Sequence, residues 1–329
     1  MKTIQATEHG AADVLKLIET EIPQPKLGQA LVKIHYAGVN FIDVAMRRGW
    51  YPNPPVPTPF IPGPEGAGEV IAIGEGVTEV KVGDRGSFMQ EEVAWLDRAY
   101  AEYIPIAAWK LILLPDDISF ETAAAMTAQG LTTHYMMNDF VRLEPGKTVL
   151  IHAAAGGMGL NLVQWAKHLG AFVIGTASSE HKAQRALALG ASEIINYTQE
   201  NFVERVKKLT NGKGADLILD GVGKTTLPVD FEAVATRGHI VTYGIAGGMP
   251  DNINPFDLLY RSRTLHGADL FDYIANREER IMRANAVWQA IREGWLKPQI
   301  SQIFPLEDAI AAHQLIEDRN NMGKILLKI

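Results

Sequence analysis

The sequence predicts an α/β protein in which a doubly wound parallel sheet is joined to a second, β-rich domain. With 329 residues, 47% of them apolar, the chain has enough material for two hydrophobic cores. Up to about Glu121 it consists of short alternating apolar runs separated by Gly-Asp and Gly-Glu turns. Beyond Glu121, apolar runs of strand length alternate with patterns of helix length, and this alternation builds a parallel sheet with helices on both faces.

The β-rich part contains two clear strand candidates and one stiff loop. Residues 30–34 and 68–73 have the period of a strand. Residues 52–64 hold seven of the chain's 17 prolines, a density that disfavours helix and central strand and favours an extended loop. This loop is either an exposed linker or the rim of an active site.

In the second part we predict four buried strands, at residues 148–151, 172–175, 217–220 and 239–243. An apolar helix is expected at 160–169 after the first of them. Towards the C-terminus we expect a charged amphipathic helix over 274–295, a further helix that opens at 304–308, and a final strand over 324–329.

Composition argues against several classes of function. The formal net charge is -7 and the basic residues are dispersed, so we expect no nucleic-acid partner. The absence of cysteine rules out disulfides, thiolate catalysis and thiolate-bound zinc. No signal peptide is evident, and no apolar run approaches the roughly 18 residues that span a bilayer. We therefore expect a cytoplasmic protein without a membrane partner.

A glycine-rich turn lies between the strand at 148–153 and the helix at 160–169, where a dinucleotide-binding fingerprint is required to lie. Ala154 takes the place of the first glycine of GxGxxG, and Gly156 and Gly159 take the second and third places. We expect the helix N-terminus to bind a pyrophosphate there. The predicted contacts are Gly156, Gly157, Met158 and Gly159. A tight turn of small residues without a ligand is the alternative.

The end of the next strand indicates which dinucleotide binds. NAD-specific folds place an acid there for the ribose 2′-hydroxyl, whereas this chain has Ala177. Ser178, Ser179 and Lys182 follow, and their hydroxyl groups and ammonium could receive a 2′-phosphate. Glu180 is accounted for as a first-turn acid of the following helix. The sequence therefore favours NADPH over NADH.

Several segments together resemble the quinone oxidoreductases of the medium-chain dehydrogenase/reductase superfamily, nearly from end to end. The segments are Gly38–Asp43, Pro62–Gly68, Val82–Arg85, Gln129–Thr132, His152–Leu160, Asn196–Tyr197 and Gly323–Ile325. The resemblance implies a GroES-like catalytic domain made of residues 1–121 and 266–329, and a Rossmann NADPH-binding domain made of residues 122–265. It also implies a homodimer.

The resemblance further implies an enzyme without zinc. In the zinc-dependent relatives a cysteine precedes the position of Asp43 and a histidine precedes that of Glu65, whereas this chain has Asn40 and Pro64 there. Neither residue supplies a ligand that zinc prefers. We expect hydride delivery from the cofactor to an acceptor that is already electrophilic, either a quinone or an α,β-unsaturated carbonyl compound.

The same resemblance implies roles for individual residues. Asn40 and Phe41 resemble the floor beside the nicotinamide, and Thr132 resembles a contact to that ring. Tyr197 resembles a phosphate or ribose contact, although it could simply cap a strand. Arg319 resembles a C-terminal arginine that reaches the cofactor, although it could be a solvated charge. Further positions on the nicotinamide side are Gly244, Ile245, Ala246, Leu270 and Phe271.

No essential general acid is assigned. Tyr51 could offer its phenol to a substrate oxygen, so we consider it with Asn40 as a catalytic candidate. A tyrosine packed at the rim is the equal alternative for Tyr51, and water is an alternative source of the proton.

Some positions depart from the family. Ala45 replaces a tyrosine found near the cofactor in bacterial relatives, Gly221 stands where serine is frequent, Ile245 and Ala246 replace more polar residues, and residues 92–97 form an extra segment at the edge of the catalytic domain. From these changes we expect a roomier and less polar pocket.

Three functions are compared. The first is an NADPH-dependent quinone reductase. The second is a double-bond reductase that acts on enals, enones or enoyl thioesters. The third is a non-catalytic NADPH-binding protein with a crystallin-like or RNA-binding role, and the acidic charge argues against the RNA-binding form.

Overall fold

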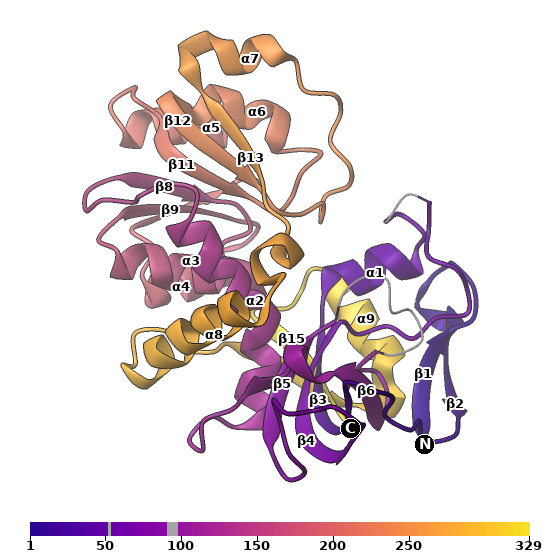
Figure 1. The fold of residues 1–329 in the computed structure, drawn as a ribbon. Helices are drawn as coiled ribbons and strands as arrows, with labels where there is room; N and C mark the ends of the chain where they lie inside the picture. The colour runs from indigo at the N-terminus through magenta and orange to yellow at the C-terminus, as the bar shows by residue number, and fades with distance from the viewer. Residues whose placement is uncertain (52–53, 91–97) are drawn as a thin grey trace. The chain divides into compact units, whose positions relative to one another are not determined.

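The computed structural model describes residues 1–51, 54–90 and 98–329, which form two compact units (Figure 1). The β-rich unit comprises Met1–Leu131, Ile274–Trp288 and Pro298–Ile329, and the sheet-and-helix unit comprises Thr132–Tyr273 and Gln289–Lys297. The predicted fold class is confirmed. The boundaries of the NADPH-binding domain, which we placed at residues 122 and 265, stay a prediction.

The sheet-and-helix unit contains six parallel strands in the order β10-β9-β8-β11-β12-β13. Their bounds are β8 (Thr148–Ile151), β9 (Phe172–Ala177), β10 (Glu193–Asn196), β11 (Ala215–Asp220), β12 (Val234–Thr242) and β13 (Thr264–Gly267). The four predicted strands are present, and the short strands β10 and β13 are additional. The strand order reverses between β8 and β11, which makes this pair the switch point of the sheet.

Helices cover both faces of this sheet. The helices α3 (Gly157–His168) and α4 (Glu180–Leu189) lie on one face, and α5 (Phe202–Leu209) and α6 (Leu227–Ala233) lie on the other (Figure 1). The buried strand residues Leu150, Ile174, Ile218 and Ile240 are wholly enclosed. Burial on both faces explains why these strands appear in the sequence as continuous apolar runs rather than alternating ones.

The β-rich unit contains a two-stranded hairpin and a seven-stranded sheet. The hairpin pairs β1 (Lys2–Ala6) with β2 (Leu15–Glu19). The sheet runs β14-β15-β3-β4-β5-β7, and β6 pairs with β3. Its strands are β3 (Gln29–Val39), β4 (Glu65–Ile73), β5 (Arg85–Met89), β6 (Tyr103–Ala107), β7 (Ile112–Leu113), β14 (Ile300–Pro305) and β15 (Lys324–Lys328). Because β15 pairs with β3, the C-terminal strand completes an N-terminal sheet.

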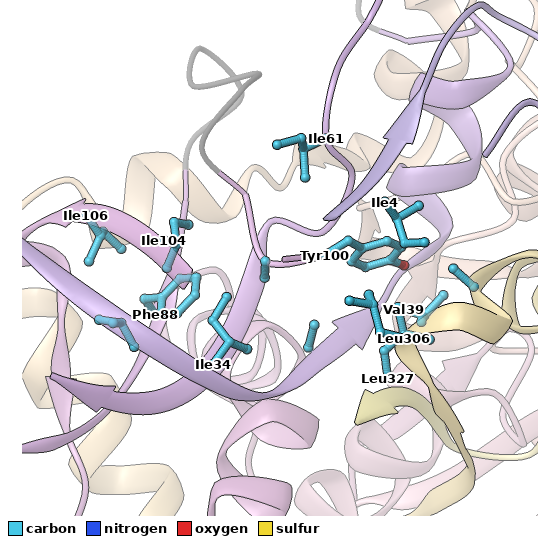
Figure 2. Packing of buried hydrophobic residues seen from close by; sticks show 14 of the residues in the cluster. Ile4, Ile34, Val39, Ile61, Phe88, Tyr100, Ile104, Ile106, Leu306 and Leu327 are labelled. Carbon is cyan, nitrogen blue, oxygen red and sulfur yellow. The ribbon is translucent and has the colours of Figure 1, made fainter. Parts of the chain in front are cut away.

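An apolar core cluster packs within the β-rich unit (Figure 2). Ile34 and Val39 of β3, Phe88 of β5 and Leu327 of β15 contribute to it, together with Tyr100. Two helices of this unit, α1 (Phe41–Arg47) and α9 (Ala309–Glu317), pack against each other.

The C-terminal elements differ in detail from the prediction. The helix expected over 274–295 is α8 (Arg277–Arg292), because residues 270–274 form the separate short helix η4 (Leu270–Ile274). The segment expected to open a helix at 304–308 instead begins as the end of β14, and a 3-10 turn, η5 (Leu306–Asp308), leads into α9. The remaining helix of comparable length is α2 (Phe120–Asn138).

The proline-rich loop is confirmed over residues 54–64, which form no helix and pair with a strand only through the isolated bridge between Phe60 and Ala6. Residues 52–53, and the extra segment at 92–97, lie outside the described residues. Within the described ranges, none of the helices combines the length and the apolar character needed to cross a membrane.

Candidate cofactor and catalytic sites

The glycine-rich turn lies between the carboxyl end of β8 and the first turn of α3. Ala153 adopts a positive φ of 49°, and its carbonyl oxygen accepts a hydrogen bond of 2.9 Å from the amide of Gly156. A Cβ atom on Gly159 would lie 2.3 Å from that same carbonyl oxygen. Only glycine therefore permits this close packing of turn and helix, which leaves the unpaired amides at the start of α3 available to an anion.

The alanine at the first glycine position is accommodated by its neighbour in β9. Ala154 is fully buried, and a Cβ atom on Gly175 would lie 2.6 Å from the Cβ of Ala154. The glycine that allows this close approach therefore stands at position 175 in β9, and not at position 154 in the turn. We did not predict Gly175 as a site residue, although a lone glycine in an apolar strand signals such close approach.

A buried histidine supports the turn from behind. The Nε2 atom of His152 lies 2.8 Å from Oδ1 of Asp230, and its Nδ1 atom lies 3.2 Å from Oγ1 of Thr176. The Thr176 hydroxyl also accepts the amide of Ala153 at 3.2 Å. Burial lowers the pKa of His152, but the Asp230 carboxylate outweighs burial, so that this pKa lies above its ordinary value. Burial raises the pKa of Asp230 to about 6.

The residues predicted to bind the 2′-phosphate lie at the carboxyl end of β9. Ser179 caps α4, and its Oγ accepts the amide of Lys182 at 3.4 Å. The Lys182 ammonium donates to Oγ of Ser178 at 3.2 Å. At the end of neighbouring β10, the amide of Tyr197 donates to Ala177, and the Tyr197 side chain is about half exposed. The structure therefore brings these residues together at one edge of the sheet, while their role as ligands stays a prediction.

The loops that follow β11 and β12 are held together by backbone hydrogen bonds. The amide of Ala246 donates to the carbonyl oxygen of Gly221 at 3.0 Å, and Gly247 donates to Val222 at 2.7 Å. A Cβ atom on Gly244 would lie 2.9 Å from the Gly221 carbonyl oxygen. Three of the predicted nicotinamide-side residues, Gly244, Ile245 and Ala246, lie in the loop after β12. Leu270 and Phe271 lie in η4, the helix after β13, and Thr132 lies in α2.

The structure does not leave the space at Gly221 open, while the expected character of the whole pocket stays a prediction. We expected a roomier and less polar pocket where Gly221 replaces serine. Instead, the ring of Tyr243 lies over Gly221: a Cβ atom there would be 2.6 Å from Cε2 and 2.9 Å from Oη of Tyr243. A phenol thus takes the space that a side chain at position 221 would occupy. The structure also encloses Ala45, which is 2% exposed and lines no open surface.

In the β-rich unit, Asn40 belongs to a buried cluster with Glu65 and Lys324. Its Nδ2 donates to Oε1 of Glu65 at 2.8 Å, and its Oδ1 accepts from Nζ of Lys324 at 2.7 Å. Lys324 also forms an ion pair with Glu65, and both side chains are at most 1% exposed. The second Glu65 oxygen accepts the amide of Ala128 at 2.7 Å. The three side chains come from β4, from β15 and from the start of α1. Lys324 and Glu65 were not predicted as site residues.

A second buried network adjoins Asn40. Asp43 accepts the amides of Asn40 and Gly63, each at 2.9 Å, and burial raises its pKa to about 6. The hydroxyl of Tyr100 lies 3.1 Å from Nε2 of His313. Burial lowers the pKa of His313 to about 3, so its imidazole is neutral at pH 7.

The other predicted residues of this unit lie at its surface or near it. Phe41 is the half-buried first residue of α1, Tyr51 is half-buried, and Arg319 is exposed with a positive φ of 55°. Their roles, like that of Asn40, stay predictions.

Comparison with known proteins identifies the family. Residues 26–116 match the alcohol dehydrogenase GroES-like domain, and residues 157–285 match the zinc-binding dehydrogenase family. A quinone oxidoreductase of Salmonella typhimurium is 38% identical over 328 residues, which cover 98% of each chain. The chain belongs to the quinone oxidoreductase family of medium-chain dehydrogenases/reductases. It is therefore an oxidoreductase, as the resemblance implied.

Two further members of this similarity group bear on its chemistry. The crystal structure of Escherichia coli quinone oxidoreductase, determined in complex with NADPH, has a TM-score of 0.93, 36% identity and complete coverage of both chains. A 2-haloacrylate reductase from Burkholderia is 36% identical over 324 residues, covering 97% of this chain and 96% of its own.

Proposed function

We propose that this member of the quinone oxidoreductase family is an NADPH-dependent reductase that transfers hydride to a quinone without a metal ion. The observation that carries the proposal is the glycine-rich turn, where Gly159 allows α3 to begin against the carbonyl of Ala153. Relatives with known structures bind NADPH, which agrees with this turn.

The residues present fit a dinucleotide phosphate. The lack of side chains at Gly156 and Gly159 leaves a cradle at the N-terminus of α3 that a pyrophosphate can fill. Ser178 and Lys182 provide a hydroxyl and an ammonium for a 2′-phosphate, and no acid lies at the end of β9 to bind a free 2′-hydroxyl. When bound, NADPH supplies the hydride, and the chain orients the reacting groups.

The residues present do not fit a catalytic zinc ion, although one matching family model describes zinc-binding dehydrogenases. The amide oxygen of Asn40 accepts a hydrogen bond from the Lys324 ammonium, and Glu65 forms an ion pair with the same ammonium. A cationic group therefore already neutralises the carboxylate, and a divalent ion would have to displace it. Asn40 and Pro64 are also poor zinc ligands. We propose no step through a metal.

The acceptor is proposed from the family, since several relatives are quinone oxidoreductases. A second candidate is an activated double bond, which the similarity to 2-haloacrylate reductase favours. Both acceptors are electrophilic without metal assistance, so the same hydride donor serves either.

A comparison of acceptors tests the proposal. The purified chain is assayed for oxidation of NADPH and of NADH with 1,4-naphthoquinone, 2-chloroacrylate and a 2-alkenal. We expect the highest kcat/KM for NADPH with the quinone. A higher kcat/KM for 2-chloroacrylate or the alkenal would replace the quinone assignment by the double-bond assignment, and no turnover with any acceptor would contradict both.

We also propose that the chain is a homodimer, as the family resemblance implies. β13 is an edge strand of the parallel sheet. In α7 (Pro255–Leu259), which precedes β13 in the chain, the side chains of Phe256 and Leu259 are 72% and 73% exposed. A sheet edge and an exposed apolar surface each favour association with a second copy.

A further inference from the structure

The Tyr243 side chain carries a polar group that the protein itself does not use. Tyr243 directly follows β12, and its amide donates to the carbonyl oxygen of Asp220 at 3.0 Å. The side chain is half-buried, and within the described part of the chain its hydroxyl has no hydrogen-bond partner. Tyrosine hydroxyls at such positions normally find a partner, so this one is available to a ligand.

The position of the ring is fixed by the glycine beneath it. A Cβ atom on Gly221 would lie 2.6–2.9 Å from Cε2, Cζ and Oη of Tyr243, closer than non-bonded atoms approach. The phenol therefore occupies the space above Gly221, and only glycine permits it. The interlocked loops after β11 and β12 hold both residues in place.

The topology indicates which half of the cofactor lies there. Ligands of such sheets bind outside the carboxyl ends of the strands, across the switch point between β8 and β11. The proposed adenosine 2′-phosphate residues Ser178 and Lys182 lie on the β9 side of that point. The ends of β11 and β12, where Tyr243 lies, then face the nicotinamide half.

We propose that the Tyr243 hydroxyl donates a hydrogen bond to the nicotinamide–ribose half of bound NADPH, and that Gly221 is required because it makes room for this phenol. The inference rests on the proposed function and adds a cofactor-binding residue to it. Burial, together with the Asp220 carboxylate, raises the pKa of Tyr243 above its ordinary value, so the hydroxyl stays a donor at neutral pH.

The test measures equilibrium binding with two ligands. Tyr243→Phe removes only the hydroxyl, and loss of one such bond weakens binding by roughly 3- to 10-fold. We expect this loss for NADPH, measured by fluorescence titration, and no change for adenosine 2′,5′-bisphosphate, which lacks the nicotinamide half. Tyr103→Phe, a half-buried tyrosine of β6, is the matched control and is expected to bind both ligands like the wild type.

The outcomes separate this inference from the proposed function. If the wild type fails to bind NADPH, both are overturned. If the wild type binds NADPH and Tyr243→Phe binds it equally well, or loses affinity for both ligands alike, only the role of Tyr243 is overturned.

A second pair of variants tests the role of Gly221. Gly221→Ser is expected to weaken NADPH binding in the presence of Tyr243, because its Cβ displaces the ring. In the Tyr243→Ala background, where the ring is gone, the same substitution is expected to have little effect. An equal effect of Gly221→Ser in both backgrounds would contradict the proposed pairing.

Discussion

Lys182 is the residue on which the preference for NADPH depends most. Its ammonium lies 3.2 Å from the Ser178 hydroxyl at the carboxyl end of β9, where it can meet a 2′-phosphate. A charge-assisted contact of this kind contributes about 1.5–3 kcal/mol. We predict that Lys182→Ala weakens NADPH binding by roughly 10-fold or more and leaves NADH binding nearly unchanged.

Titration of both cofactors into Lys182→Ala checks this, with the exposed Lys213→Ala as a control of equal charge. Unchanged NADPH affinity in Lys182→Ala would refute the assignment of the 2′-phosphate site.

Asp43 makes stability depend on pH in a predictable direction. Burial raises its pKa from 3.8 to about 6, so the folded state keeps a proton that the unfolded state has already lost. As pH rises from about 4 to about 6, the free energy of unfolding therefore falls, by about 3 kcal/mol through this group. Above pH 6 the contribution is constant.

Denaturant unfolding of the wild type and of Asp43→Asn at several pH values measures this effect. We predict that the unfolding free energy of the variant lacks this fall. The difference in unfolding free energy between the wild type and the variant therefore shrinks between pH 4 and pH 7. Asp13→Asn, which alters an exposed carboxyl, should track the wild type. A difference between Asp43→Asn and the wild type that does not vary with pH would contradict the prediction.

Substitutions of Lys324 and Glu65, which form a buried ion pair, are predicted to have strongly coupled effects on the unfolding free energy. Removal of one partner leaves a buried, uncompensated charge and costs about 3–5 kcal/mol. Lys324→Met should therefore lower the unfolding free energy by about that amount, and Glu65→Gln added to it should restore much of the loss. Thermal unfolding of the wild type, both single variants and the double variant measures the coupling, and additive losses would contradict it.

Residues that act locally could be predicted from the sequence, whereas long-range partners could not. Gly156 and Gly159 were predicted because a strand, a turn and a helix follow one another along the chain. Lys324 and Glu65 are 259 positions apart, and no spacing rule connects them. Tyr243 was missed because Gly221 was considered only as a lost hydroxyl group.

At the scale of the element, the junction of β8 and α3 is the most constrained feature. A methyl group on Gly159 would meet the carbonyl oxygen of Ala153 at 2.3 Å, which neither side can relieve without a shift of the helix. We predict that Gly159→Ala weakens NADPH binding by about 10-fold or more, because the amides of α3 move away from the pyrophosphate.

The matched control is Gly267→Ala at the end of β13, where a Cβ atom meets nothing within 4 Å. Fluorescence titration with NADPH compares the two variants. Wild-type affinity in Gly159→Ala would contradict the proposed position of the pyrophosphate.

Elements with a strong apolar run were predicted closely, and a mostly exposed strand was not. The run at 148–151 coincides with β8, since three buried apolar residues in succession after Thr148 fit a central strand. The strand β14 was missed because its residues are mostly exposed and end in Pro305, which disfavours a central strand. Its partner β15 was recognised from its apolar run.

At the scale of the whole molecule, the proposed homodimer depends on the apolar surface formed by Phe256 and Leu259. We predict that the double variant Phe256→Asp/Leu259→Asp is monomeric at concentrations where the wild type is dimeric, because charges then replace the apolar contact. Sedimentation velocity measures both. Leu27→Asp alters an equally exposed leucine of the β-rich unit and should stay dimeric. A monomeric wild type would contradict the proposal.

The whole chain is proposed to reduce its acceptor with NADPH and without a metal ion. The most direct measurement is the rate of NADPH oxidation by 1,4-naphthoquinone, catalysed by protein that has been stripped with a chelator and analysed for metal content. We expect the metal-free protein to keep its full rate and added Zn²⁺ not to increase it. Loss of the rate on stripping, with recovery on addition of Zn²⁺, would show that the reaction depends on the metal.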